Sequence, residues 1–213
     1  MQMTDFSLYL ITDRHQSGGS DLTEVVRQSL EGGTRAVQLR EKDLSGAEVY
    51  RMALELRALT RRYGARLMIN DRLDIALAVE ADGVQLGINS MPVDAARRLL
   101  GPQMIIGYSA HAIDEALRVQ ADGADFITFS PVYHTPSKAA YGEPCGVKKL
   151  ADAACALEIP VIALGGIGQT NITEALSANV QGIAVISAII AAADPRAAAV
   201  SLLKKIEEYA QRP

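Results

Sequence analysis

Short runs of aliphatic and β-branched residues recur along the whole chain, and helical stretches separate them. Many of these runs are apolar throughout instead of alternating between apolar and polar residues. Strands of this kind are buried on both faces, as parallel strands covered by helices are. The pattern predicts eight strands, at residues 7–12, 35–40, 66–70, 83–86, 103–109, 125–130, 160–164 and 182–187.

The segments between these runs have the composition and the end signals of helices. The segment 21–33 ends in a pair of glycines, and the alanine-rich segment 46–64 ends in Gly64. Glycine is typical of the position just past the last helical turn. Eight strand–helix units within 213 residues predict a compact α/β protein, a (β/α)8 TIM barrel that occupies residues 1–213 as a single domain.

An open, doubly wound sheet is the competing architecture. Such a sheet normally has fewer strands and carries a glycine-rich dinucleotide loop after the first one. Here the first strand leads into Thr12, Asp13 and Arg14. The Gly-Gly-Ile-Gly sequence at 165–168 follows the seventh strand and lacks the full spacing of the dinucleotide fingerprint. The sequence therefore favours the barrel and disfavours a dinucleotide site.

Composition excludes several other classes of protein. The 49% hydrophobic and 22% charged residues fit a globular domain. A net charge of −4 without a long basic run argues against a nucleic-acid partner. No apolar stretch approaches the roughly 18 residues of a membrane span, and the first residues lack a secretory signal. We expect a cytoplasmic protein, with Cys145 and Cys155 as small buried or half-buried residues.

Polar residues that directly follow the strands are the candidates for function, because the chemistry of such barrels lies at the carboxyl ends of the strands. The second strand delivers Gln38 and Arg40 on one side, and Glu41 and Lys42 follow. A guanidinium and an ammonium group at one mouth form a clamp for an anion.

The third strand ends in Asn70 and Asp71. The carboxylate suits a hard cation and the amide suits a substrate. Capping of the following helix, 73–80, is an equally good explanation for Asp71.

The fifth and sixth strands lead to further polar residues. Ser109 and His111 close the fifth strand, and the long loop 133–146 after the sixth carries Thr135, Ser137 and Lys138. A long loop in a compact domain is more often functional than idle. Alternatively, His111 is a structural histidine and Lys138 a solvated surface charge.

The last two strands end in small residues, Gly165 and Gly166 after the seventh strand and Ser187 and Ala188 after the eighth. Their backbone N–H groups can approach a ligand, as in the phosphate site that barrels commonly build from these two loops. The alternative is that the glycines merely permit tight turns. Together the candidates suit a substrate bearing two separate phosphate groups.

Six motifs resemble, in order, those of thiamine phosphate synthase and its TenI-like relatives, and they extend over nearly the whole chain. They are Gln-Leu-Arg-Glu-Lys at 38–42, Ile-Asn-Asp-Arg-Leu-Asp-Ile-Ala at 69–76, Gly-x-Ser-x-His at 107–111, Thr-Pro-Ser-Lys at 135–138, Ala-Leu-Gly-Gly-Ile at 163–167 and Ala-Val-Ile-Ser-Ala-Ile at 184–189.

The resemblance implies an enzyme that joins hydroxymethylpyrimidine diphosphate to a thiazole phosphate and releases pyrophosphate with the help of Mg²⁺. It further implies a role for each matching residue. The pyrimidine diphosphate would be held by Gln38, Arg40, Lys42, Asn70, Ser109 and Lys138, the metal by Asp71, and the thiazole phosphate by Thr135, Ser137, Gly166, Ile186 and Ser187.

The chain departs from this pattern at Ser90. Synthases typically have His-Leu-Gly-Gln-x-Asp after the fourth strand, and its aspartate is the second metal ligand. Mg²⁺ is often held by one or two carboxylates together with water and phosphates, so Asp71 alone could still position it, with lower affinity.

Two alternatives remain open at the level of sequence. TenI-like thiazole tautomerases need no metal and use a histidine to carry a proton, a role that the resemblance would give to His111. A relative that binds a thiamine precursor without turnover is the other. Asp13, His15 and His134 match no role in the family. A homodimer is compatible with the sequence, which identifies no interface.

Overall fold

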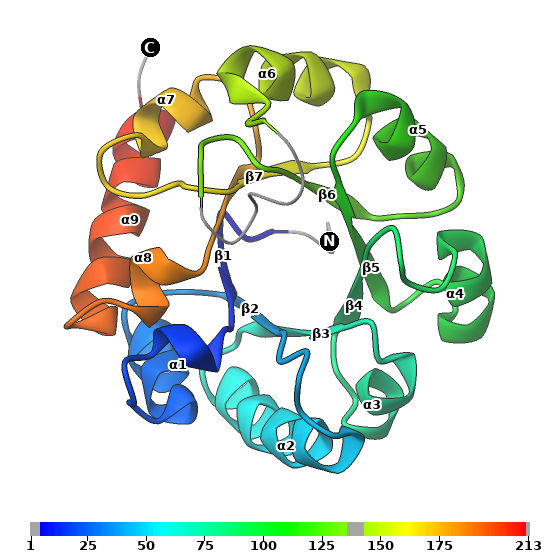
Figure 1. The fold of residues 1–213 in the computed structure, drawn as a ribbon, viewed down its shortest axis with the longest axis vertical. Coiled ribbons are helices and arrows are strands. Elements are labelled where there is room, and N and C mark those ends of the chain that lie inside the picture. Colours follow the sequence, from blue (N-terminus) through cyan, green and yellow to red (C-terminus); the bar gives the residue numbers. More distant parts are fainter. Residues whose placement is uncertain (1–4, 136–142, 212–213) are drawn as a thin grey trace.

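The computed structural model describes residues 5–135 and 143–211, which form a closed barrel of parallel strands surrounded by helices (Figure 1). Each strand pairs with its neighbours in the sequence, and pairing of Leu8 with Ile183 joins the first strand to the last. The strands are β1 (Leu8–Ile11), β2 (Ala36–Leu39), β3 (Arg66–Asn70), β4 (Gly83–Leu86), β5 (Ile105–Ala110), β6 (Phe126–Phe129), β7 (Val161–Leu164) and β8 (Gly182–Val185).

A helix follows every strand, so the predicted (β/α)8 barrel is confirmed. A short 3₁₀ helix precedes the first α-helix, and two α-helices follow β8. The helices are η1 (Arg14–Gln16), α1 (Leu22–Glu31), α2 (Gly46–Arg62), α3 (Leu73–Ala78), α4 (Val93–Leu100), α5 (Ile113–Ala121), α6 (Gly146–Ala156), α7 (Ile172–Leu176), α8 (Ser187–Ile190) and α9 (Pro195–Ala210).

Local sequence signals explain where several helices begin. The side chain of Asp21 accepts a hydrogen bond from the Thr23 N–H at the start of α1. Ser45 and Glu48 form a reciprocal capping box at the start of α2. These side chains satisfy N–H groups that have no partner inside the helix. None of the helices among the described residues is long and apolar enough to cross a membrane.

The hydrophobic core has two layers, one between the strands and the helices and one inside the barrel. Alternate residues of a strand point to opposite sides, so on β1 Leu8 and Leu10 pack toward the helices while Tyr9 and Ile11 pack inside. This alternation is why the strand sequences are apolar throughout. Cys145 is half-buried as expected, but Cys155 is exposed on α6, where that expectation was wrong.

Candidate active site

Three cavities lie at the carboxyl ends of the strands and share lining residues. A polar cavity of about 90 Å³ lies over the ends of β2 to β5, and a larger one of about 580 Å³ lies over β7 and β8. A small central cavity of about 60 Å³ has Arg40, Asn70 and Ser109 in common with the first and Leu164 and Ile186 in common with the second. The three cavities therefore form one groove across the barrel mouth.

The polar cavity collects most of the charged residues that the sequence singled out. Its lining includes the side chains of Arg40, Lys42, Asn70, Asp71 and His111. Arg40 is half-buried, whereas Lys42 is exposed. These two cations come from the end of one strand and face a cavity that also has a carboxylate, so an anion and a metal ion can be held together there.

The carboxylate of Asp71 is fixed by its neighbours. Its Oδ1 accepts a hydrogen bond from the Ser90 hydroxyl, and its Oδ2 accepts one from Asn70 Nδ2 at 2.7 Å. Asp71 has a φ of +61°, a left-handed conformation that aspartate tolerates better than most residues. The residue at the start of α3 is Arg72, and no side chain caps this helix. The helix-cap explanation for Asp71 is therefore wrong.

Ser90 stands where the resemblance leads one to expect a second metal carboxylate. Its hydroxyl accepts a hydrogen bond from the Gly87 N–H at 2.7 Å in addition to donating to Asp71. Within residues 5–135 and 143–211, no group of three or more His, Cys, Asp or Glu side chains could hold a metal ion. A site with one carboxylate and nearby amide and hydroxyl oxygens fits Mg²⁺ provided that substrate phosphates supply further ligands.

His111 is oriented by two hydrogen bonds. Its backbone N–H donates to Glu115 Oε2 at 2.9 Å, and the ring nitrogen Nδ1 lies 2.6 Å from the carbonyl oxygen of Ser130. Because a carbonyl can only accept, Nδ1 carries a proton and donates it. This bond holds the ring at the edge of the polar cavity, where an imidazole can exchange a proton with a ligand.

The large cavity is lined by glycines, other small residues and aliphatic side chains. Gly165, Gly166, Ile186 and Ser187 lie around it, together with Thr135. The loop after β6 packs directly against the two glycines, since a Cβ on Gly166 would lie 2.8 Å from the carbonyl oxygen of His134. Here glycine permits both a positive φ and this close approach, and it leaves backbone groups accessible to a ligand.

Tyr133 and Asn171 brace this end of the groove. Asn171 donates to the Gly166 carbonyl at 2.9 Å and accepts from the Gly168 N–H at 2.8 Å. Burial, with a hydrogen bond to Glu174, raises the pKa of Tyr133 to about 12, so its hydroxyl stays protonated and donates to Glu174 at 2.9 Å. Sequence reasoning missed both residues, because neither directly follows a strand.

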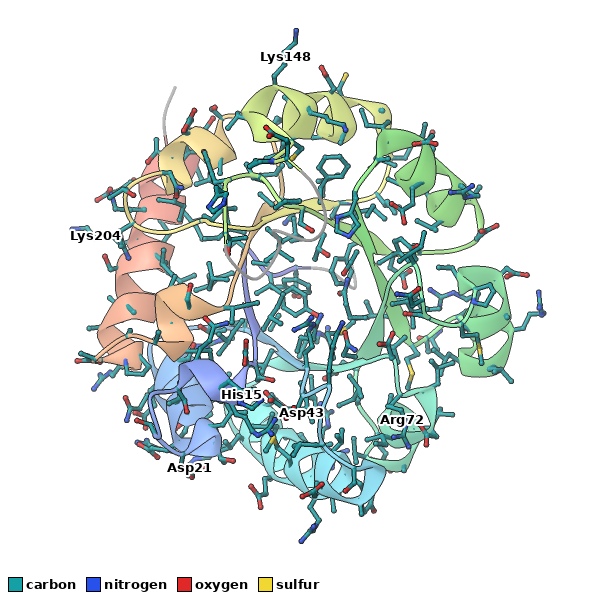
Figure 2. All side chains as sticks on the ribbon, viewed as in Figure 1. His15, Asp21, Asp43, Arg72, Lys148 and Lys204 are labelled. Carbon is teal, nitrogen blue, oxygen red and sulfur yellow. The ribbon has the colours of Figure 1, made fainter. Side chains whose placement is uncertain are left out.

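Other polar residues near the mouth serve the structure of its outer rim. Glu41 is buried and accepts hydrogen bonds from Arg14, so it points away from the groove, unlike Arg40 and Lys42. Arg14 also donates two hydrogen bonds to Asp43, which hold the pKa of that carboxyl well below its usual range. Figure 2 shows His15 next to Asp43, and its Nε2 lies 3.0 Å from the carboxylate.

The remaining candidates have different positions. Asp13 lines the central cavity and accepts a hydrogen bond from Gln16 Nε2 at 2.6 Å. His134 is exposed. Ser137 and Lys138 lie outside the described residues. Gln38 lines the central cavity with Arg40, as their shared side of the strand predicted. The sequence did not single out Gln85, although a polar residue in the apolar run 83–86 was a usable signal.

Comparison with known proteins agrees with this arrangement. Residues 8–189 match the family model described as thiamine monophosphate synthase. A relative from Geobacter sulfurreducens is 59% identical over 203 residues, which cover 95% of each chain. A thiamine-phosphate synthase of Moorella thermoacetica is 43% identical over 197 residues, covering 92% of this chain and 94% of the relative.

The fold agrees as well. A solved structure of thiamine phosphate pyrophosphorylase from Pyrococcus furiosus superposes with a TM-score of 0.90 at 40% identity, covering 97% of this chain and 98% of that one. A family model that matches most of the chain, and relatives of this similarity over nearly their full length, lead to one conclusion: the chain belongs to the thiamine monophosphate synthase family.

Proposed function

We propose that the chain is a thiamine-phosphate synthase, a transferase that joins hydroxymethylpyrimidine diphosphate to a thiazole phosphate and releases pyrophosphate. The main support is the groove, in which a cationic cavity with a carboxylate connects with a separate, larger cavity lined by glycines, a serine, a threonine and aliphatic residues. Two phosphorylated substrates can meet in such a groove. The proposal concerns residues 1–213 as one domain, and it requires neither nucleic acid nor a membrane.

In this proposal the cationic end binds the pyrimidine diphosphate. Arg40 and Lys42 face the diphosphate, while Gln38, Asn70 and Ser109 contact the substrate from the central cavity. Negative charge grows on the diphosphate as its bond to the pyrimidine's exocyclic carbon breaks. Fixed cations stabilise that charge more in the transition state than in the bound substrate, which lowers the barrier.

Mg²⁺ belongs at the same end, where Asp71 would hold it with the phosphates of the substrate. When bound, the ion neutralises charge on the departing pyrophosphate. Ser90 and Asn70 fix the orientation of the Asp71 carboxylate through their hydrogen bonds. We expect Lys138, which the resemblance assigns to the pyrimidine diphosphate, to add a further positive charge.

The other end of the groove binds the thiazole phosphate. Backbone groups of Gly166, Ile186 and Ser187 contact the phosphate together with the side chain of Thr135. We expect Ser137, which the resemblance assigns to the same phosphate, to take part as well. Ser187, the first residue of α8, lines this cavity together with Ile186, which directly precedes the helix. The thiazole nitrogen then attacks the pyrimidine carbocation, which the electron-rich aminopyrimidine stabilises.

A thiazole tautomerase is the second candidate. The observation that favours it is the hydrogen bond from His111 Nδ1 to the Ser130 carbonyl, which holds the imidazole at the edge of the polar cavity, where it can exchange a proton with a ligand. The cations Arg40 and Lys42 favour the synthase, because moving a double bond in a monophosphate does not require them.

Incubation of the purified protein with both substrates tests the proposal. We expect pyrophosphate to be released only when both substrates and Mg²⁺ are present, measured by a coupled pyrophosphate assay. Omitting the thiazole phosphate or adding EDTA is the control. A spectral change of the thiazole carboxylate phosphate alone, without metal, would instead identify a tautomerase, and binding without either reaction would contradict both enzymes.

A Ser90→Asp variant tests the position of the metal. The Ser90 hydroxyl donates to Asp71, so a carboxylate at this position would lie next to the first one and offer Mg²⁺ a second anionic ligand. We expect the Mg²⁺ concentration for half-maximal activity to fall several-fold, roughly what one added ligand provides. Ser90→Asn, similar in size but uncharged, should not lower it. Equal Mg²⁺ dependence of Ser90→Asp and the natural chain would place the metal elsewhere.

A further inference from the structure

A continuous network of hydrogen bonds crosses the inside of the barrel beneath the central cavity. Gln38 Nε2 donates to the Tyr9 hydroxyl at 3.0 Å, and Tyr9 donates to Gln85 Oε1 at 3.3 Å. Gln85 Nε2 donates to Ser109 Oγ at 3.1 Å and to Thr128 Oγ1 at 3.3 Å. The network thus connects Gln38 with Ser109. These two of its five residues also line the central cavity.

The direction of these hydrogen bonds follows from the Gln38 amide, whose Nε2 faces the Tyr9 hydroxyl. Tyr9 is fully buried, and burial raises its pKa above its ordinary value, so the hydroxyl keeps its single proton. That proton goes to Gln85, since Tyr9 already accepts one from Gln38. An amide whose oxygen accepts must present its NH₂ group on the other side, toward Ser109 and Thr128.

Ser109 receives two hydrogen bonds in this arrangement. One comes from Gln85 Nε2, and the other comes from the Thr128 hydroxyl at 3.1 Å. Thr128 is fully buried, so its proton needs a partner inside the barrel. With both incoming bonds made, the Ser109 hydroxyl has its own proton to donate, and Ser109 is the member of this part of the network that reaches the groove.

Gln85 fits inside the barrel because Gly107, the residue paired with it on the next strand, has no side chain. A Cβ on Gly107, which pairs with Gln85 across β4 and β5, would lie 2.5 Å from Gln85 Oε1 and 2.3 Å from Phe126 Cζ. Gln85 is only 2% exposed and lines none of the three cavities. It therefore acts on a ligand only through the residues that it holds.

We propose that Gln85 is a positioning residue that makes Ser109 a hydrogen-bond donor toward the ligand. The groove then selects a ligand with an acceptor atom at this point, such as a ring nitrogen or a phosphate oxygen of the pyrimidine diphosphate. This inference rests on the proposed function. Gln38, which uses one amide N–H on Tyr9, presents its remaining N–H and its carbonyl to the same ligand.

A Gln85→Glu variant replaces the amide NH₂ group, which donates to Ser109 and Thr128, by an oxygen atom. The shape of the side chain stays nearly the same. An ionised glutamate only accepts, so Ser109 and Thr128 would turn their protons toward it, and Ser109 would no longer donate to the ligand. A protonated glutamate has one O–H that can donate to Ser109 while its other oxygen accepts from Tyr9, as glutamine does. Burial raises the pKa of a carboxyl group, which brings this titration into a measurable range.

The measurement is kcat/KM for the pyrimidine diphosphate as a function of pH. We expect Gln85→Glu to lose about tenfold or more above the pKa of the new carboxyl and to recover toward the natural chain as the pH falls. Gln85→Met, similar in size but without the amide, should be impaired at every pH without this transition. The KM for the thiazole phosphate should stay within about twofold in both variants.

Coinciding pH profiles of Gln85→Glu and the natural chain would overturn the proposal. If that variant fails to fold, Gln85→Met decides, and a kcat/KM for the pyrimidine diphosphate within about twofold of that of the natural chain would then overturn it. A natural chain that releases no pyrophosphate refutes the proposed function instead. In that case, calorimetry measures the affinity of Gln85→Glu and of the natural chain for the pyrimidine diphosphate across pH. Coinciding affinity profiles would then overturn the role of Gln85.

Discussion

An Arg40→Ala variant is expected to release pyrophosphate at least about 100-fold more slowly than the natural chain, a loss of about 3 kcal/mol in transition-state stabilisation. Arg40 is the cation that lines both the polar cavity and the central one. Its backbone N–H is held by the Thr12 hydroxyl at 2.9 Å, which fixes where the side chain begins. A guanidinium that meets growing negative charge affects kcat more than KM, and steady-state pyrophosphate assays separate the two.

The matched control is Arg35→Ala. Arg35 precedes the same strand, β2, and lies at the opposite end of the barrel, where it donates to the carbonyl groups of Leu30 and Thr34. Its removal deletes the same charge without touching the groove, so kcat should stay within about twofold. Equal losses in the two variants would mean that overall charge or stability, not the position of Arg40, determines the rate.

Phe126→Ala is expected to lower the free energy of unfolding by about 3–5 kcal/mol. Phe126 is fully buried inside the barrel, with its ring centroid 5.5 Å from that of Phe6 and 5.8 Å from that of Tyr9. Alanine would leave a cavity that these rings cannot fill without moving. Urea denaturation followed by circular dichroism measures the change.

Leu99→Ala on α4 is the control for this loss, because Leu99 is 64% exposed and its truncation leaves no cavity. We expect its unfolding free energy to stay within about 0.5 kcal/mol of that of the natural chain. A Phe126→Ala variant as stable as Leu99→Ala would contradict the close packing of the three rings. Tyr9 belongs to both the ring cluster and the hydrogen-bond network, so Phe126→Ala should also weaken binding of the pyrimidine diphosphate.

The sequence predicted the barrel because its strands are short, separate and apolar on both sides. The expected runs overlap all eight strands, and differences are confined to the ends, as at 103–109, where the strand is Ile105–Ala110. The same regularity predicted the groove, since residues that directly follow parallel strands meet at one end of a barrel. Arg40, Lys42, Asn70, Asp71 and His111 do line one cavity.

The direction of each polar side chain and its hydrogen-bond partners could not be predicted in this way. Glu41 lies between Arg40 and Lys42 in the chain, yet it points away to Arg14 because successive side chains alternate in direction and a partner from another loop is available. Asp71 has Ser90 and Asn70 as its partners instead of the helix that follows it. The bonds from Arg14 to Glu41 and from Ser90 to Asp71 join residues 27 and 19 positions apart, so they depend on how the loops pack, which no local pattern encodes.

The amino-acid sequence by itself determined the architecture and the end of the barrel at which the chemistry lies, since both follow from periodicity and strand order. Only the tertiary structure decided which polar groups donate and which accept there. Gln85 illustrates the reason: its effect on Ser109 depends on Tyr9, Thr128 and the space left by Gly107, which come from three strands other than its own. The strands have to close into a barrel before these groups can meet.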